Sequence, residues 1–194
     1  MSHDMEGGVG TTRPAWSKPA FRLCNTRSMT TNFERAFEAR PDVYAAWVQL
    51  NTAIKASMDL RRYELVTLAA ARSLRSSYCC LAHGSVLRDR FAEPVREIAL
   101  DHRTAGLDEV DVAVMDLAER VVSDATSIED ADLERLRALG LAEDEIMDVV
   151  LAAAARCFFS KTLDALGVRA DSTYLGVAPE LREALVVGRP IADA

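Results

Sequence analysis

Apolar residues recur in this chain at the spacing of an α-helix rather than that of a β-strand. The clearest series follows the i, i+3, i+4, i+7, i+11 pattern of one helical face and consists of Val43, Ala46, Trp47, Leu50 and Ile54. The sequence has no convincing alternation of apolar and polar residues, no glycine-rich phosphate loop and no internal repeat. Alanine and leucine, both good helix formers, dominate an apolar fraction of 49%. The sequence therefore predicts an all-α fold, arranged as a helical bundle.

The length of 194 residues is enough for one domain with a single hydrophobic core. Residues 1–28 mix glycine, threonine, proline, serine and arginine, and we expect them to form an irregular N-terminal arm. Trp16 and Phe21 indicate that part of this arm docks. We expect residues 29–194 to form a single helical domain, whose tail from Val168 is loop-rich with one short helix.

Capping residues and glycines divide this domain into helices. Residues that favour a helix N-terminus predict starts near positions 32, 41, 59, 77, 94, 108, 127 and 143. Gly140 and Gly167 follow the last apolar residues of two segments and are expected to end them. His102 follows the short helix that starts at Pro94, where we expect an exposed histidine that stabilises the helix dipole.

The stretch from Ser76 to His83 combines reactive residue types. Ser76 and Ser77 favour a helix start, which places Cys79 in the first turn, near free backbone N–H groups and the positive end of the helix dipole. Both favour the thiolate, which is the reactive form of cysteine. His83 lies one turn further on the same face and could take or return a proton at Cys79. The alternative is an inert buried cysteine beside a histidine that satisfies a nearby polar group.

Glu64 is also unusual, because the residues after it, apart from Thr67, are apolar until Arg72. A carboxylate in a largely buried helix is costly unless it is paired or functional. Two helices joined by a short break would let Glu64 face Cys79 and His83. The three residues together supply a nucleophile, a base and an acid that orients the base or relays protons.

This pattern resembles the carboxymuconolactone decarboxylase superfamily, specifically its AhpD-like alkylhydroperoxidase branch. The branch has a Glu, about twelve residues, Cys-x-x-Cys, three residues and a His. Glu64, Cys79 and His83 match the Glu, the second Cys and the His, whereas Ser76 stands in place of the first Cys. The resemblance covers roughly residues 40–170, and the segment 156–167 is similar to the closing helix of the family.

The resemblance implies an AhpD-like helical bundle that forms a homo-oligomer, built from dimers or as a trimer or hexamer. It also implies a thiol-dependent peroxidase with antioxidant activity. In such an enzyme Cys79 attacks a small-molecule hydroperoxide, while Glu64 and His83 move the protons. The resemblance implies neither a cofactor nor a metal ion.

The replacement of the first cysteine changes how an oxidised Cys79 would be reduced. Ser76 cannot form the internal disulfide, so we expect an external thiol or dithiol to act as reductant. Cys80 is an awkward resolving residue, because about 100° of helix rotation separates it from Cys79. Ser76, Tyr78 and Cys80 are therefore candidate accessory residues.

Two other functions stay open. A carboxymuconolactone decarboxylase-like lyase would share the histidine and act on a small lactone acid, with a cationic pocket that could draw on Arg61, Arg62, Arg72 and Arg75. A non-enzymatic helical oligomer with a redox-sensing or vestigial cysteine is the other. Zinc binding by Cys79, Cys80 and His83 is disfavoured, because adjacent cysteines diverge on a helix and a fourth ligand is missing.

The charge and composition of the chain limit the classes of partner and the compartment that we expect for it. The net charge of −7 gives no indication of nucleic-acid binding. The longest apolar run is too short to span a membrane, and the N-terminal residues lack the apolar core of a signal peptide. Four cysteines without a regular framework suit a reducing compartment, so we expect a cytoplasmic protein. We expect Cys24 to be an incidental free thiol.

Overall fold

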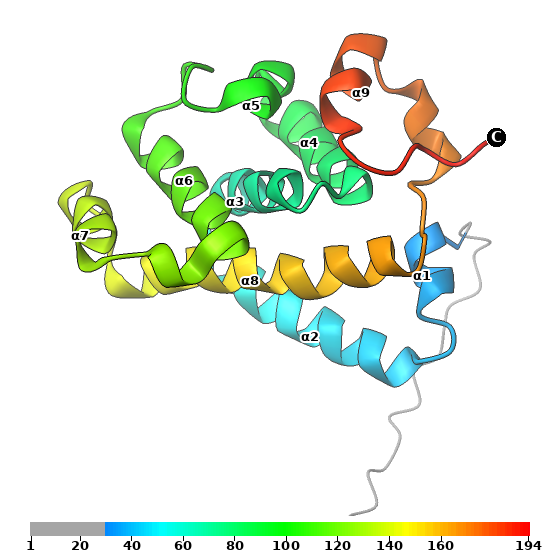
Figure 1. The fold of residues 1–194 in the computed structure, drawn as a ribbon, viewed down its shortest axis with the longest axis horizontal. Helices are drawn as coiled ribbons and strands as arrows, with labels where there is room; N and C mark the ends of the chain where they lie inside the picture. The colour runs from blue at the N-terminus through cyan, green and yellow to red at the C-terminus, as the bar shows by residue number, and fades with distance from the viewer. Residues whose placement is uncertain (1–29) are drawn as a thin grey trace, which may run out of the picture.

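The computed structural model describes residues 30–194, which form α-helices and two 3-10 helices without a β-strand (Figure 1). The helices are α1 Asn32–Ala36, α2 Pro41–Ser57, α3 Leu60–Ser73, α4 Ser77–Phe91, α5 Val95–Asp101, α6 Glu109–Asp124, η1 Ala125–Ser127, α7 Asp130–Ala138, α8 Glu143–Ala165, η2 Ser172–Gly176 and α9 Pro179–Leu185. The predicted all-α fold is confirmed. The expected arm of residues 1–28, with Trp16, Phe21 and Cys24, lies outside the described residues.

Helix α3 lies at the centre and packs against α4, α6 and α8 (Figure 1). Every residue from Tyr63 to Ala71 is buried, because other helices cover all sides of α3. The small side chains of residues 69–71 let these helices approach closely. The buried Thr67 hydroxyl is satisfied by donating a hydrogen bond to the Tyr63 carbonyl at 2.8 Å. Glu64 is the buried charged residue of α3.

The helix ends follow the expected local signals. The Asp59 carboxylate accepts a hydrogen bond from the Arg62 backbone N–H at 2.9 Å and caps α3. Asp108 caps α6 in the same way, with its carboxylate 2.7 Å from the Asp111 N–H. Gly140 and Gly167 follow α7 and α8 with φ of 94° and 76°, a conformation that glycine adopts without strain. These predicted boundaries are confirmed to within about two residues.

The C-terminal tail contains the one expected short α-helix, α9, which packs against α4 and α5. The contact is close: a Cβ added at Gly84 would lie 2.9 Å from Leu185 Cδ1, and Leu185 is fully buried. Further on, the Gly188 N–H donates to the Ser77 hydroxyl at 2.8 Å. The tail therefore holds the start of α4, the helix that carries Cys79 and His83.

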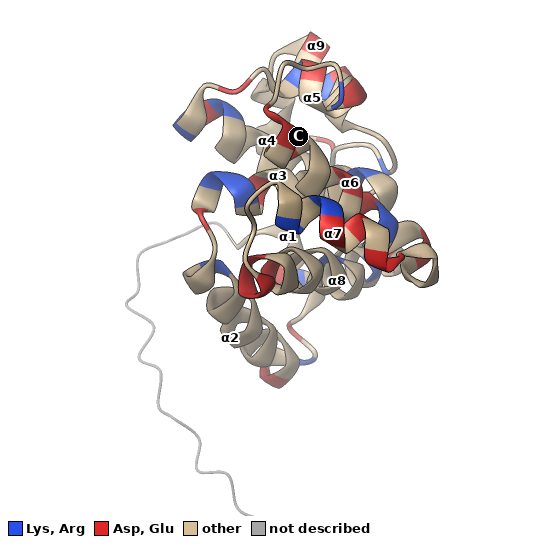
Figure 2. Cartoon of the chain, turned by 90° about the vertical axis from the view of Figure 1, so that its left-hand side faces the viewer, with Lys and Arg blue, Asp and Glu red and all other residues tan. Residues whose placement is uncertain are grey.

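Charge is distributed unevenly over the helices. Helix α6 is mostly acidic and α7 runs from acidic to basic residues, whereas α2 carries no charge between Asp42 and Lys55 (Figure 2). Among residues 30–194, no helix has both the length and the apolar character that crossing a bilayer requires.

Candidate active site

A cavity of about 280 Å³ lies between α2, α4 and α8, and residues of α1 and of the segment around η2 complete its lining. Its lining combines six Phe, Tyr and Trp side chains with several polar groups, and consists of Thr31, Phe33, Tyr44, Trp47, Val48, Asn51, Thr52, Tyr78, Cys79, Ala82, His83, Arg156, Phe159, Asp171 and Tyr174. Two predicted site residues, Cys79 and His83, thus share one cavity. An apolar cavity with a few convergent polar groups is typical of a small-molecule site.

Cys79 is the third residue of α4, in its first turn, and its side chain is only 3% exposed. The Ser160 hydroxyl, from α8, donates a hydrogen bond to Cys79 Sγ at 3.1 Å. Cys79 therefore combines a position at a helix N-terminus with a hydroxyl donor at its sulfur.

Glu64 and His83 form the predicted pair across α3 and α4. His83 Nδ1 lies 2.6 Å from Glu64 Oε2, and Lys55 Nζ lies 3.4 Å from Glu64 Oε1. Burial opposes the charged carboxylate, but the hydrogen bond with His83 and the neighbouring Lys55 together hold the pKa of Glu64 below its ordinary value. Glu64 stays ionised behind His83 and does not itself line the cavity.

Arg156 fixes the protonation of His83. Its Nη1 lies 3.1 Å from His83 Nε2, and a guanidinium can only donate. Nε2 therefore holds a lone pair and Nδ1 carries the proton that faces Glu64. Burial, only partly offset by Glu64, lowers the pKa of His83, which agrees with a neutral imidazole. His83 Nε2 is thus a potential proton acceptor whose lone pair is engaged by Arg156.

Arg156 is a site residue that the sequence reasoning missed. It sits in the middle of α8, it is 4% exposed, and its Nη2 donates to Asn51 Oδ1 at 3.1 Å. Glu64 was recognised as a charged residue within an apolar stretch of helix, and the same pattern holds for Arg156. It follows four alanines and precedes Cys157 and two phenylalanines. Asn51 and Ser160 were missed as well, and no local pattern distinguishes them from ordinary polar helix residues.

The three accessory candidates have different surroundings. Ser76 is the buried N-cap residue of α4, but its hydroxyl does not cap the helix. Tyr78 lines the cavity and donates to Asp171, and burial together with Asp171 raises the pKa of its phenol. Cys80 is fully buried and outside the cavity lining, and burial strongly raises the pKa of its thiol. Cys80 is therefore a poor nucleophile.

The four arginines suggested for a cationic pocket lie elsewhere. Arg61 contacts Glu93 and Asp111 at 2.5 Å each, and Arg62 contacts Glu145 at 2.8 Å. Arg72 and Arg75 donate to backbone carbonyls in and after α9. None of the four lines the cavity, and Arg156 is the arginine that does.

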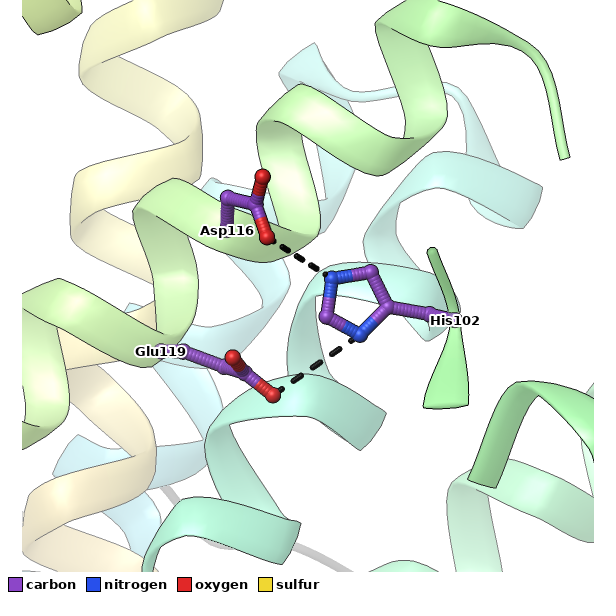
Figure 3. Close-up of side chains that lie close together, drawn as sticks. All are labelled: His102, Asp116 and Glu119. Atoms are coloured by element: carbon purple, nitrogen blue, oxygen red, sulfur yellow. Dashed lines mark hydrogen bonds and ion pairs between the residues drawn. The ribbon is translucent and has the colours of Figure 1, made fainter. Parts of the chain in front are cut away.

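His102 is a correction to the sequence reasoning, because it is buried rather than exposed. Its Nε2 lies 3.0 Å from Asp116 Oδ1, and its Nδ1 lies 3.7 Å from Glu119 Oε1, both on α6 (Figure 3). These three residues resemble a metal-ligand set. However, Arg103 Nη2 already contacts Asp116 at 2.5 Å and Glu119 at 2.9 Å. A metal ion would have to displace this guanidinium, so we interpret the cluster as a clamp between α5 and α6.

Sequence comparison bears on the segment that holds most of this site. Residues 41–105 match the model of the Carboxymuconolactone decarboxylase family. The resemblance to this family is confirmed. The match runs from the start of α2 past the end of α5 and includes Glu64, Cys79 and His83, whereas Arg156 and Ser160 lie beyond it.

Two solved structures share the fold. One is the alkylhydroperoxidase AhpD core of an uncharacterized peroxidase-related protein from Ralstonia eutropha JMP134, with a TM-score of 0.69 and 21% identity over 74% of this chain and 78% of that one. The other is an uncharacterized peroxidase-related protein from Silicibacter sp. TM1040, with a TM-score of 0.69 and 21% identity over 75% and 79% of the two chains. The AhpD-like fold is thereby confirmed. No curated protein matches the chain.

Proposed function

We propose that this protein is a thiol-dependent peroxidase that reduces small hydroperoxides with Cys79. The observation that carries the proposal is the placement of Cys79 in a cavity with several aromatic residues, with Ser160 donating to its sulfur and a neutral His83 lining the same cavity. The family match and the peroxidase-related names of the two structural neighbours support a function of this kind or a decarboxylase-like one.

The first step breaks the peroxide bond. When Arg156 Nη1 releases its hydrogen bond to His83 Nε2, this nitrogen takes the proton of the Cys79 thiol, directly or through water, and the thiolate attacks the distal oxygen of ROOH. An S–O bond forms, the O–O bond breaks, and the alkoxide takes the proton back from His83 and leaves as ROH. Cys79 is oxidised to the sulfenic acid. Glu64 holds Nδ1 and stabilises the imidazolium that forms transiently.

The second step needs a thiol from outside the protein. Ser76 offers no sulfur, and Cys80 is buried away from the cavity. One external thiol condenses with the sulfenic acid to give a mixed disulfide and water. A second thiol then releases Cys79 and leaves with the first as a disulfide. The net reaction is ROOH plus two thiols to ROH, water and one disulfide.

Consumption of cumene hydroperoxide with dithiothreitol as reductant tests the proposal. Cys79→Ser should abolish turnover, and His83→Ala should lower it on the order of a hundredfold, a typical loss for a general acid–base group. Cys80→Ser and Cys157→Ser are matched controls and should retain activity. Turnover that survives Cys79→Ser would contradict the proposal.

Site-resolved trapping of sulfenic acids separates the peroxidase from a non-enzymatic oligomer with an ordinary thiol. Cys79 should be oxidised before Cys24, Cys80 and Cys157, because among the cysteines of residues 30–194 only Cys79 combines a helix N-terminus with a hydroxyl donor at sulfur. His83→Ala should slow its oxidation and leave the other thiols unchanged. Equal trapping at all four cysteines, or no effect of His83→Ala, would favour the non-enzymatic interpretation.

A lyase that resembles carboxymuconolactone decarboxylase is the second candidate. It is favoured by Arg156, which gives the cavity a positive charge suited to an acidic substrate. Such a lyase would not need the sulfur, so conversion of a carboxylated lactone that survives Cys79→Ser would favour it.

A further inference from the structure

The guanidinium of Arg156 has no counter-ion among residues 30–194. Its two contacts through Nη1 and Nη2 are to the neutral groups of His83 and Asn51, and its Nε, also buried, has no hydrogen-bond partner in the described part of the chain. No carboxylate of residues 30–194 forms an ion pair with it. An unpaired buried charge is costly, so an anionic partner would stabilise it.

The other charges at the cavity are already engaged. Asp171 accepts hydrogen bonds from the Asn32 backbone N–H, at 2.8 Å, and from the Tyr78 hydroxyl. Glu64 is paired with His83 and Lys55 behind the cavity wall. The positive charge of Arg156 is therefore left for a ligand.

Arg156 is held rigidly in place. Its guanidinium carbon lies 4.8 Å from the centroid of the Trp47 ring and 5.3 Å from that of Phe159. Stacking on two rings fixes the plane of the guanidinium, which suits it for a planar carboxylate rather than a point anion. The cavity of about 280 Å³ is just below the size range of drug-like pockets, so the ligand is small.

The sulfur lies about one helical turn from this charge. Ser160, which donates to Cys79 Sγ, follows Arg156 at i+4 on α8, a rise on the order of 6 Å along the helix. A ligand with a carboxylate on Arg156 would thus bring a group a few atoms away to Cys79. The aromatic walls between them suit an aromatic or short apolar body.

We infer that Arg156 anchors the carboxylate of an acidic substrate, which makes a small carboxylate-bearing hydroperoxide the preferred substrate class. The inference rests on the proposed peroxidase function for the identity of the second group, but not for the anchor itself. Arg156 binds the carboxylate at one end, and Cys79 reduces the hydroperoxide at the other. A neutral hydroperoxide of the same shape would leave the guanidinium without a counter-ion.

A matched substrate pair provides the kinetic test. We would compare kcat/KM for 4-carboxycumene hydroperoxide with that for its methyl ester, which removes the charge and keeps the ring and peroxide. We expect the wild-type protein to favour the acid about tenfold or more, since hydrogen bonds between two charged groups are the strong ones. Arg156→Met should bring this ratio close to one. Arg62→Met, which removes one positive charge outside the cavity, should keep the wild-type ratio.

Binding provides a test that does not depend on turnover. Calorimetry should detect binding of 4-isopropylbenzoate but not of 4-isopropylbenzamide to the wild-type protein, and Arg156→Met should lose the difference. If Arg156→Met does not fold, the same comparison of benzoate and benzamide binding is made with Arg156→Lys. Its result and the selectivity of the wild-type protein then test the anchor.

The outcomes separate this inference from the proposed function. Equal wild-type rates for acid and ester would overturn the anchor and leave the peroxidase standing. Carboxylate-selective binding without turnover of either hydroperoxide would overturn the peroxidase and support the anchor. Equal binding of 4-isopropylbenzoate and 4-isopropylbenzamide to the wild-type protein would overturn the anchor. Selectivity that survives Arg156→Met would overturn it as well.

Discussion

At the scale of single residues, His83 predicts how stability depends on pH. Burial lowers the pKa of His83 in the folded protein, whereas in the unfolded chain an imidazole titrates near about 6.5. The unfolded chain thus binds the proton more readily, so the free energy of unfolding should fall as pH drops through and below about 6.5. Urea unfolding at about pH 7.5 and 5.5 should show this fall, since both values lie well above the ordinary pKa of Glu64. His83→Gln should show a smaller difference, and an unchanged difference would mean that His83 does not titrate in this window.

Ser76 carries a second prediction at this scale. It is the N-cap of α4 and Cys79 is the third helical residue, so the two side chains share the i, i+3 spacing at the start of one helix. Ser76→Cys should therefore allow a disulfide with Cys79, which is within the usual Cα–Cα reach for such a bond. Mass spectrometry after mild peroxide treatment should show the loss of two hydrogens from a peptide pair that the wild-type protein lacks. Two alkylatable but unlinked thiols would mean that the local backbone differs from that of the Cys-x-x-Cys proteins.

Some of the site residues could be recognised from the sequence, whereas the surroundings of others depend on contacts between distant segments. Glu64 was recognisable because a lone carboxylate in an apolar helix must be paired, and its contact with His83 bears that out. The same reasoning would have found Arg156. His102 was misjudged, because its burial depends on Asp116 and Glu119, which reach it only through the packing of α6. The catalytic roles of Cys79, His83 and Glu64 stay predictions.

At the scale of helices, the tail after α9 predicts how α4 is held. A Cβ at Gly188 would lie 1.9 Å from the Arg75 carbonyl oxygen, a clash with backbone that no side-chain rotation can relieve. Gly188→Ala should destabilise the protein by roughly 1–3 kcal/mol and disturb the start of α4. Gly176→Ala is the matched control, because an added Cβ there meets nothing within 4 Å. Thermal unfolding of both variants checks this, and equal melting temperatures would show that the tail moves aside freely.

Helix positions were readable from sequence because caps and glycines act locally. Asp59, Asp108, Gly140 and Gly167 each mark an end through their own backbone or side chain. The arrangement of the helices was not readable in this way. Which helix lies at the centre depends on contacts between segments far apart in the chain, and the resemblance, rather than periodicity, supplied the AhpD-like fold.

At the scale of the whole molecule, an apolar stripe on α8 favours self-association. Met147, Leu151 and Phe158 share one helical face at i, i+4 and i+11, and they are 56%, 41% and 44% exposed. Neighbouring α2 carries no charge between Asp42 and Lys55 (Figure 2). Exposed apolar patches of this kind mark interaction surfaces.

This stripe also borders the cavity, because the Phe158 ring lies 5.5 Å from the Trp47 ring, whose other contacts include Arg156. We therefore expect a homo-oligomer that pairs through α8, so that association covers the wall of the site. Light scattering coupled to size-exclusion chromatography should give more than one chain per particle. Leu151→Lys should shift the protein toward the monomer, since it places a charge in the stripe that association would bury. Leu100→Lys, on α5 at 57% exposure, is the control and should leave the mass unchanged. A wild-type monomer at micromolar concentration, or equal effects of both substitutions, would contradict pairing through α8.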